Sequence, residues 1–479
     1  MRASLIATGL ALLSPALAAA KDPSPSALRR VVEGALDRPA FAAAFWAVEV
    51  RSLTSGRILY ERNARKNMTP ASTLKLVTTA AALDAFGPDA RLRTTLESSG
   101  RLDDQGRLLG DLFLVGRGDP LLGRPGPDGK SGFDALADAL RAAGVRRIEG
   151  RLVGHDGLFK DRRGEDWQWG DLVWCYGAEV SALAYRDNCA ALLVSAGERV
   201  GDPVALERTP ESRYYAVVST ATTGPPGSES DLRLQRDLGS NLIRLSGTLP
   251  IGGERKELAV ALEDPALYAA TAFGEILEAR GIRASLGPAR SSDPVPSGAR
   301  TLAGHDSPPL AEILAEINKH SQNLYTEMLL RLLGAQVKGE GSAAAGRDAV
   351  AEFLKRLGLA ESASLVDGSG LSRTDLVTPH LLAGLLVAMS RHPHAEPFRR
   401  SLAVAGVDGT LERRLRGTAA EGRVFAKTGT LRQSNALAGY VHAKSGARFV
   451  FSMVVNHHTA PAAEATAAID AVVEALAGY

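Results

Sequence analysis

Cysteine is almost absent from this chain. Among 479 residues there are only two cysteines, Cys175 and Cys189. Such a low content excludes the disulfide-dense scaffolds of small secreted proteins, and neither cysteine has companions at the spacing of a metal site. In an oxidising compartment the two could form one disulfide that closes a small loop, or both could remain as buried thiols. The sequence leaves both alternatives open.

Blocks of like charge and aromatic-rich segments are also missing. Aromatic residues make up 5% of the chain, and 56 basic residues nearly balance 54 acidic ones, for a formal net charge of +2. A nucleic-acid groove needs clustered cations, and a single-stranded one also needs aromatic side chains for base stacking. We therefore expect no nucleic-acid partner.

Long apolar runs are missing beyond the first residues. After residue 20 no stretch approaches the ~20 apolar residues that a bilayer-spanning helix needs, so we expect no transmembrane anchor. Residues 1–20 combine Arg2, an apolar run at 5–13 and small residues at 16–20, which is typical of a cleaved signal peptide. The run is too short for the alternative, an uncleaved anchor. We predict an exported, periplasmic protein, with at most a loose association with membrane or wall.

The two ends of the chain carry matching patterns. Residues 45–61 alternate apolar and polar around a turn and predict a β-hairpin, as do residues 437–455. A helix is expected beside each hairpin, at 26–36 and at 461–476. These patterns favour one sheet built from both ends of the chain and flanked by helices, which is a mixed α/β (α+β) fold.

The middle of the chain divides into two styles. Residues 94–299 are rich in short β-like runs between Gly, Pro, Asp and Ser, whereas residues 309–389 space their apolar residues as helices do. Residues 291–300 have the composition of a linker. The length suits two or three domains. We expect a discontinuous domain at 21–93 and 300–479, interrupted by a β-rich insertion at 94–299 with two subdomains.

Ser72 and Lys75 form the first candidate motif. They open an apolar helix at 76–86, and residues at i and i+3 of a helix share one face. A lysine amine that is neutral because of burial or nearby positive charge can take the proton of a serine hydroxyl. Taken alone, a serine at this place is more often a simple helix cap.

Two further motifs follow in the chain. Ser321-Gln322-Asn323 lies between two predicted helices, and Lys427-Thr428-Gly429-Thr430 follows a predicted strand at 423–426. A lysine beside a glycine on a strand allows a substrate backbone to approach a fixed cation. Lys130 and Lys444 also precede Ser-Gly pairs, but neither has this order and strand context.

The three motifs together resemble the signature set of penicillin-binding proteins and serine β-lactamases: Ser-x-x-Lys, Ser-x-Asn and Lys-Thr-Gly. The long insertion between the first two is similar to that of the low-molecular-mass class C penicillin-binding proteins, a D-Ala-D-Ala carboxypeptidase/endopeptidase family. Further stretches carry the resemblance, at 70–75, 116–120, 176–183, 367–372 and 427–431. The chain departs from the family in Gln322, where Asp is common, and in Cys175.

The resemblance implies a transpeptidase-like fold and a serine-type D-Ala-D-Ala carboxypeptidase or endopeptidase. Ser72 would attack the substrate carbonyl, Lys75 would take its proton, and Ser321 would relay a proton to the leaving amine while Asn323 orients Lys75. Lys427 would keep the site electropositive. Thr428 and Thr430, on either side of Gly429, would bind the terminal carboxylate, and the N–H groups of Ser72 and Thr430 would form an oxyanion hole.

The resemblance also implies the partners of the site. The substrates would be peptidoglycan stem peptides that end in D-Ala-D-Ala or are cross-linked, and β-lactam antibiotics would acylate Ser72 as covalent inhibitors. No cofactor and no metal are implied. The histidines agree with this, since His392, His394, His457 and His458 lack acidic or cysteine companions at ligand spacing.

The sequence bears on three alternatives to this interpretation. A class A β-lactamase needs a Glu and a nearby Asn between the second and third motifs, and residues 324–426 contain no Asn. A Ser-His-Asp hydrolase would need a Gly-x-Ser-x-Gly elbow, which the chain lacks. A non-catalytic wall-binding or assembly protein could retain the fold, but here all three motifs keep their reacting side chains.

Overall fold

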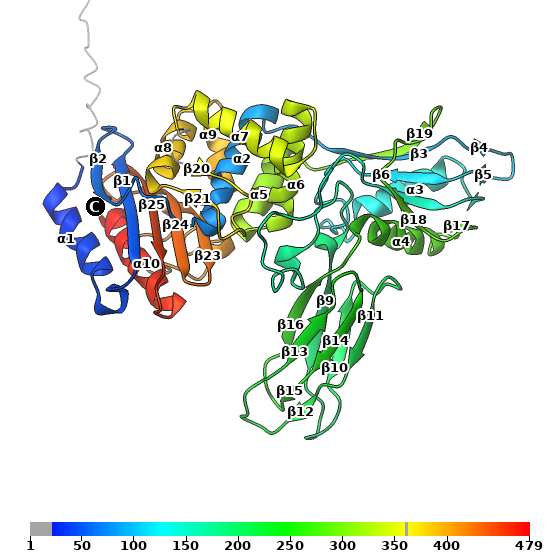
Figure 1. Ribbon diagram of the computed structural model, residues 1–479, viewed down its shortest axis with the longest axis horizontal. Helices are drawn as coiled ribbons and strands as arrows, with labels where there is room; N and C mark the ends of the chain where they lie inside the picture. Colours follow the sequence, from blue (N-terminus) through cyan, green and yellow to red (C-terminus); the bar gives the residue numbers. More distant parts are fainter. Residues whose placement is uncertain (1–21, 360–362) are drawn as a thin grey trace, which may run out of the picture.

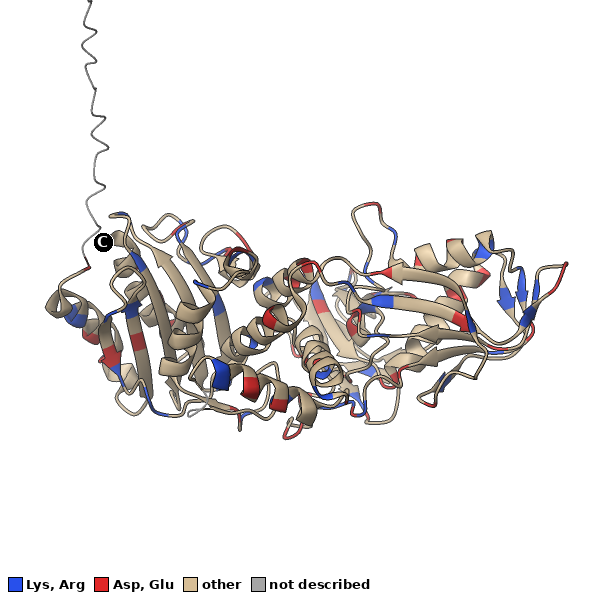
Figure 2. Cartoon of the chain, turned by 90° about the horizontal axis from the view of Figure 1, so that it is seen from above, with Lys and Arg blue, Asp and Glu red and all other residues tan. Residues whose placement is uncertain are grey.

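The computed structural model describes residues 22–359 and 363–479. The expected signal peptide at 1–20 lies outside the described residues. The molecule is elongated. The N-terminal and C-terminal parts of the chain together form a sheet-and-helix lobe, and the middle of the chain forms two further lobes (Figure 1). Figure 2 shows Lys and Arg interleaved with Asp and Glu from one end of the molecule to the other.

A six-stranded antiparallel sheet joins the two ends of the chain, as the sequence predicted. Its order is β2-β1-β25-β24-β23-β22, and β1 pairs with β25 from Phe45↔Asn456 to Ser52↔Phe449. Apolar residues face both sides because helices cover both. The strands are β1 (Phe45–Ser52), β2 (Ile58–Arg62), β22 (Ala403–Val404), β23 (Val424–Leu431), β24 (Ser434–His442) and β25 (Arg448–Asn456).

Helices α1 (Pro25–Leu36) and α10 (Ala462–Gly478) cover one face of this sheet. Their apolar residues form a single core with β1 and β25, in which Val32, Val472 and Phe451 are all fully buried. This packing confirms the two terminal helices that the sequence predicted. Within the described residues no helix has the length and apolar character to cross a membrane.

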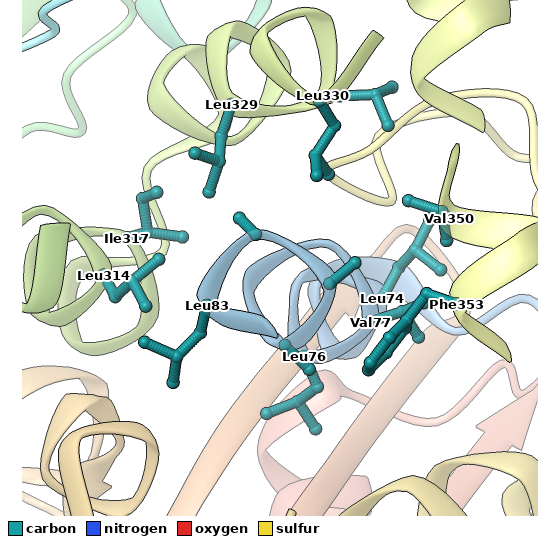
Figure 3. Packing of buried hydrophobic residues seen from close by; sticks show 14 of the residues in the cluster. Leu74, Leu76, Val77, Leu83, Leu314, Ile317, Leu329, Leu330, Val350 and Phe353 are labelled. Atoms are coloured by element: carbon teal, nitrogen blue, oxygen red, sulfur yellow. The ribbon is translucent and has the colours of Figure 1, made fainter. Parts of the chain in front are cut away.

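Helix α2 (Lys75–Phe86) lies at the centre of the layer on the other face. Its residues from Lys75 to Leu83 are all buried, because the sheet lies on one side of the helix and other helices pack around it, in one core with Leu76, Val77 and Leu83 (Figure 3). A helix buried all round needs no polar face. The surrounding helices are α5 (Leu310–His320), α6 (Asn323–Leu333), α7 (Ala343–Arg356), α8 (Pro379–Met389) and α9 (Ala395–Ser401).

The middle of the chain forms two further lobes. One contains a five-stranded sheet of order β18-β8-β6-β3-β19, a four-stranded sheet of order β17-β7-β5-β4, and two helices, α3 (Gly132–Ala142) and α4 (Pro265–Glu278). Its strands are β3 (Arg93–Ser98), β4 (Arg101–Leu102), β5 (Arg107–Leu109), β6 (Leu112–Val115), β7 (Arg147–Ile148), β8 (Leu152–His155), β17 (Arg283–Ala284), β18 (Ala289–Ser291) and β19 (Arg300–Asp306).

The other lobe is entirely β and lies below the first in Figure 1. It contains the sheets β10-β9-β16, β11-β14-β13 and β12-β15. Its strands are β9 (Cys189–Ser195), β10 (Ala205–Thr209), β11 (Ala216–Ser219), β12 (Thr222–Gly224), β13 (Arg233–Arg236), β14 (Leu242–Ser246), β15 (Thr248–Pro250) and β16 (Lys256–Ala261).

The expected boundary at residue 299 needs correction. Strand β19 pairs with β3 from Arg300↔Ser98 to Asp306↔Arg93, so the sheet of the inserted region continues to residue 306. The Ser, Pro and Gly residues at 291–300 mark the connection from β18 to β19 rather than a domain boundary. Their composition predicted a loop correctly, but composition does not reveal which sheet the following strand joins.

Residues 156–188, called the strap below, connect β8 to β9 with little regular structure. The strap crosses from the inserted lobes to helix α6 of the sheet-and-helix lobe, where Arg331 donates to the carbonyl oxygen of Asp161. A disulfide joins Cys175 of the strap to Cys189, the first residue of β9. This bond resolves the alternative that the sequence left open.

Candidate active site

Ser72 lies in a single 3-10 turn, η2 (Ala71–Leu74), that leads into α2. The Oγ atom of Ser72 lies 2.9 Å from Nζ of Lys75. Lys75 is fully buried, and this burial lowers its pKa to about 7, although the carboxylates of Asp367 and Glu327 act in the opposite direction. Near neutral pH a large fraction of this amine is therefore uncharged and able to act as a base.

The other contacts of Lys75 define the direction of proton transfer. Its Nζ atom lies 2.6 Å from Oδ1 of Asn323 and 2.7 Å from the carbonyl oxygen of Ser369. Both oxygens can only accept hydrogen bonds, so they use the two N–H groups of a neutral amine. The remaining lone pair is left for the hydroxyl proton of Ser72, as nucleophilic attack requires.

The second motif reaches two different lysines from one turn. Ser321 ends α5 in the left-handed conformation, with φ of 61°, and its Oγ accepts a hydrogen bond of 2.9 Å from Nζ of Lys427. Asn323 begins α6, and its Nδ2 donates to the carbonyl oxygen of Tyr176 over 2.9 Å. This second contact fixes the amide so that its oxygen faces Lys75.

The third motif lies on β23, at the edge of the six-stranded sheet. Lys427 is fully buried, and burial, together with the charge of Lys75, holds its pKa well below the ordinary value. Its Nζ also donates to the carbonyl oxygen of Thr428 over 3.0 Å. Strand β22 pairs with β23 only at Phe425 and Ala426. The motif begins at the next residue, Lys427, where β22 no longer pairs with this strand.

Two glycines leave room for the segment that carries the nucleophile. A Cβ atom on Gly429 would lie 2.7 Å from the carbonyl oxygen of Pro70, and one on Gly370 would lie 2.0 Å from that of Ala71. Ala71, just before the nucleophile, adopts a left-handed φ of 48°, which is unfavourable for a residue with a side chain. The sequence predicted that Gly429 admits a substrate backbone, whereas the close neighbour in the structure is the segment that carries Ser72.

A buried carboxylate positions the Ser369 carbonyl that contacts Lys75. Oε1 of Glu327 accepts hydrogen bonds from the N–H groups of Gly368 and Ser369, each 2.9 Å long. Oδ1 of Asp367 accepts from the N–H groups of Ser369 and Gly370. The sequence placed residues 367–372 among the resembling stretches but gave them no role, because the contacts that define it are distant in sequence.

A cleft of about 810 Å³ opens at these groups. Of the predicted site residues, Ser72, Ser321, Asn323 and Thr430 line it, while Lys75 and Lys427 are buried behind them. Thr428 donates its hydroxyl to Oγ1 of Thr410 over 2.9 Å. The sequence missed several further lining residues: Asp171, Tyr176, Leu371, Arg373, Arg432, Gln433 and His458. In the described part of the chain, no group of His, Cys, Asp and Glu side chains could hold a metal ion.

This geometry defines a class of protein. A serine whose proton can pass only to a buried, partly neutral lysine is an acyl-transfer nucleophile, and the order of its supporting motifs on this fold is that of the penicillin-binding serine enzymes. The protein is therefore a serine-type peptidase of the penicillin-binding fold.

The chain belongs to the D-Ala-D-Ala carboxypeptidase 3 (S13) family, whose model matches residues 28–477. It is 36% identical over 480 residues to a D-alanyl-D-alanine carboxypeptidase of Actinomadura sp. (strain R39), covering 97% of this chain and 87% of the relative. It is 27% identical to the D-alanyl-D-alanine carboxypeptidase DacB of Haemophilus influenzae, covering 85% of each chain. The crystal structure of penicillin binding protein 4 from that organism superimposes with a TM-score of 0.82 at 25% identity, covering 96% of this chain and all of that one.

Proposed function

We propose that this enzyme cleaves the D-Ala-D-Ala bond at the free end of peptidoglycan stem peptides, or the bond between D-alanine and the amine of a cross-link. The observation that carries the proposal is the arrangement of Lys75, whose two acceptor contacts leave its lone pair to Ser72. Membership of the S13 family supports the choice of bond.

Acylation follows from the positions of the first-motif residues. Oγ of Ser72 forms a bond to the carbonyl carbon of the penultimate D-alanine while its proton passes to Nζ of Lys75. Negative charge then develops on the substrate oxygen, and the N–H groups of Ser72 and Thr430 are assigned to bind it. Each such donor is worth roughly 3–4 kcal/mol of transition-state stabilisation in comparable enzymes.

Departure of the amine requires a proton. Ser321 is assigned to deliver it, because its Oγ accepts from Lys427 over 2.9 Å and lines the same cleft as Ser72. Lys427, Thr428 and Thr430 are assigned to the terminal carboxylate, a feature that a strand edge rich in amine and hydroxyl donors recognises. A water molecule then cleaves the ester, releasing the shortened peptide and returning a proton to Ser72.

β-Lactams should acylate Ser72 in the same way and leave slowly. Glu327, a carboxylate that follows the second motif closely, is fully buried and bound to Arg331 and two backbone N–H groups. It therefore has no free oxygen to activate a water for deacylation. This supports slow release rather than a class A β-lactamase mechanism.

The proposal includes a location and a division of the chain. A periplasmic enzyme loosely associated with membrane or wall would meet this substrate without a membrane-spanning helix. Residues 21–92 and 307–479 are assigned to the catalytic domain, and residues 93–306, from the start of β3 to the end of β19, to the insertion, with one subdomain around β3 and β8 and another around β9 and β14. The pairing of β19 with β3 supports boundaries at 92 and 306 in place of the expected 93 and 299.

Purified muropeptides test the proposal. The mature protein is incubated with monomeric pentapeptides and with cross-linked dimers, and mass spectrometry identifies the bond that is cut. Loss of a single D-alanine from the monomer indicates carboxypeptidase action, and conversion of the dimer to monomers indicates endopeptidase action. The Ser72→Ala variant is the control. Cleavage of neither substrate by wild-type enzyme that still binds labelled penicillin would overturn the choice of substrate.

A further inference from the structure

The strap contributes a backbone atom to the catalytic machinery, although it belongs to the inserted region. The carbonyl oxygen of Tyr176 accepts the hydrogen bond of 2.9 Å from Nδ2 of Asn323, and Oδ1 of the same amide contacts Nζ of Lys75 at 2.6 Å. An unbroken line of contacts therefore runs from the strap through Asn323 and Lys75 to Ser72.

The orientation of the Asn323 amide matters for catalysis. With the amide as observed, its oxygen accepts from Lys75 and leaves the lysine lone pair free. With the amide turned over, an N–H group would face Nζ of Lys75 and would compete with the Ser72 hydroxyl for that lone pair. The carbonyl of Tyr176 holds the productive orientation, because a carbonyl oxygen can pair only with the NH₂ end of the amide.

The disulfide adjoins this carbonyl directly. Cys175 precedes Tyr176, and both lie in the short turn η3 (Cys175–Gly177). Its partner, Cys189, begins β9 and pairs with Ala261 of β16, so the bond ties the turn to the end of a sheet. The Cα atoms of the two cysteines are 5.7 Å apart, and a turn held at this distance has little freedom to withdraw its carbonyl.

We propose that the Cys175–Cys189 disulfide positions the Tyr176 carbonyl so that Asn323 keeps its oxygen towards Lys75, which makes acylation of Ser72 dependent on an intact disulfide. The inference rests on the proposed function in one respect, the role of Lys75 as base. Cys175, Cys189 and the backbone of Tyr176 are positioning residues in this scheme, since none of them touches the reacting atoms.

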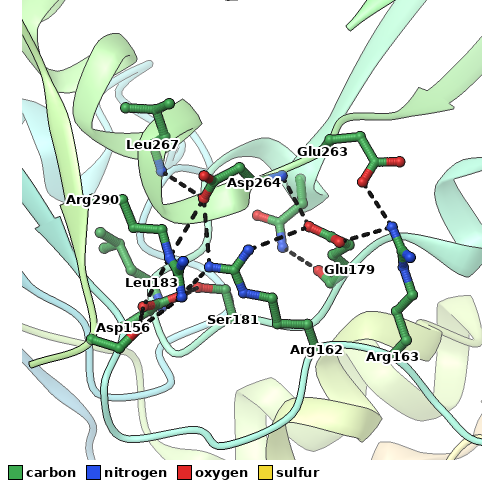
Figure 4. Close-up of polar contacts among 12 residues, drawn as sticks. Asp156, Arg162, Arg163, Glu179, Ser181, Leu183, Glu263, Asp264, Leu267 and Arg290 are labelled. Atoms are coloured by element: carbon green, nitrogen blue, oxygen red, sulfur yellow. Dashed lines mark hydrogen bonds and ion pairs between the residues drawn. The ribbon is translucent and has the colours of Figure 1, made fainter. Parts of the chain in front are cut away.

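Other contacts hold the strap in place without the disulfide. Arg162 forms ion pairs with Asp156 and Asp264, and Arg163 forms ion pairs with Glu179 and Glu263 at 2.9 and 2.7 Å (Figure 4). These side chains come from the strap and from the connection between β16 and α4. Breaking the disulfide should therefore release the turn at Tyr176 locally while the rest of the strap stays folded.

A variant that lacks the disulfide provides the first test. Cys175→Ala/Cys189→Ala is compared with wild type in the second-order rate of Ser72 acylation by a fluorescent penicillin, with far-UV circular dichroism to verify the fold. A displacement of ~1 Å in a catalytic group can cost about a hundredfold in rate, so we expect acylation to be about ten- to a hundredfold slower. Acylation at the wild-type rate would overturn the inference.

A double-mutant cycle separates positioning from general destabilisation. Asn323→Ala removes the amide through which the disulfide is proposed to act, so removing the disulfide in that background should cost no further rate. Substitutions that act through one shared contact have non-additive effects on the activation free energy, whereas the effects of independent substitutions add. An equal fold-loss in the presence and absence of the Asn323 amide would assign the disulfide a purely structural role and overturn the inference.

Reduction of the native enzyme gives a readout that needs no substitution of the cysteines. Added phosphine reductant should slow acylation of folded wild-type protein and leave the double-alanine variant unchanged, and reoxidation should restore the rate. If the double-alanine variant proves unfolded, the reduction experiment alone tests whether acylation depends on the disulfide. An unchanged acylation rate in fully reduced, folded wild type would refute the inference. Failure of the proposed function looks different, because oxidised wild type would then cleave neither muropeptide, whatever its rate of labelling at Ser72.

Discussion

Nε1 of Trp167 donates a hydrogen bond of 2.9 Å to Oδ2 of Asp367. Trp167 belongs to the strap and Asp367 to the buried loop that supplies the Ser369 carbonyl to Lys75, so the inserted region supports the catalytic base from a second side. Asp367 is almost completely buried, with 1% of its surface exposed, and a buried carboxylate depends on each of its donors.

Trp167→Phe should destabilise the protein. The substitution keeps an aromatic ring but removes the donor to Asp367, and a hydrogen bond to a charged group is worth about 1.5–3 kcal/mol. We expect denaturant titrations to show a free energy of unfolding that is lower than that of wild type by this amount, and we expect slower acylation of Ser72. Trp169→Phe is the matched control, because that side chain is 80% exposed and should show neither effect. Equal stability of the two variants would remove the assigned role of the strap contact.

The acylation rate should depend on pH through Lys75. Burial lowers the pKa of this amine to about 7, and only the neutral form can accept the proton of Ser72. The second-order rate constant for β-lactam acylation should therefore rise about tenfold per pH unit below pH 7 and level off above it. Stopped-flow measurements from pH 5 to pH 9 check the profile. A rate independent of pH across this range would mean that Lys75 is not the base.

The same lowered pKa makes a prediction about stability. In the unfolded chain Lys75 titrates at its ordinary value of 10.5, so between about pH 7 and 10.5 the unfolded state binds more protons than the folded state. The stability that this group contributes is therefore complete above pH 10.5. It falls by about 1.4 kcal/mol per pH unit as the pH is lowered from 10.5 to about 7, and the loss is complete below the folded-state pKa. In denaturant titrations from pH 7.5 to 9.5, the free energy of unfolding of wild type should rise with pH by this amount relative to that of Lys75→Met. Parallel curves for the two proteins would contradict a buried amine with a lowered pKa.

Much of the fold followed from local pattern. The hairpins at the two ends of the chain, the terminal helices and the helices of the central layer have periodicities that act within a few residues. That both ends of the chain build one sheet was also predicted from the two matching hairpins, although the pairing of β1 with β25 in particular was not. The place of β19 was not, since the pairing partner of a strand depends on a sheet edge far away in the sequence.

The candidate site divides in the same way. Ser72, Lys75, Ser321, Asn323 and Lys427 were predicted because each motif is local. The structure places Lys75 within hydrogen-bond distance of Ser72 and Asn323, and Lys427 within that distance of Ser321. The Ser369 carbonyl and the Tyr176 carbonyl were not predicted. Backbone acceptors carry no residue-type signal, so a sequence cannot reveal which carbonyl a lysine or an amide will meet.

Glu327→Gln tests how much of the base's geometry depends on buried charge. Glu327 is fully buried between Arg331, which donates to its Oε2 over 3.1 Å, and the N–H groups of Gly368 and Ser369, which donate to its Oε1. Glutamine keeps the shape and one acceptor oxygen, but its NH₂ group must face either the Arg331 guanidinium or the backbone N–H groups. Removing one partner of a buried ion pair typically costs about 3–5 kcal/mol.

We expect the Glu327→Gln protein to lose stability in this range and to acylate more slowly, because the loop that carries the Ser369 carbonyl loosens. The exposed Glu340 provides the control, since Glu340→Gln changes the net charge of the protein by the same amount at an exposed position. Thermal unfolding and β-lactam acylation are measured for both variants. A stable Glu327→Gln enzyme with a wild-type acylation rate would show that the two backbone N–H contacts alone hold the carbonyl, and that the buried charge is dispensable for positioning Lys75.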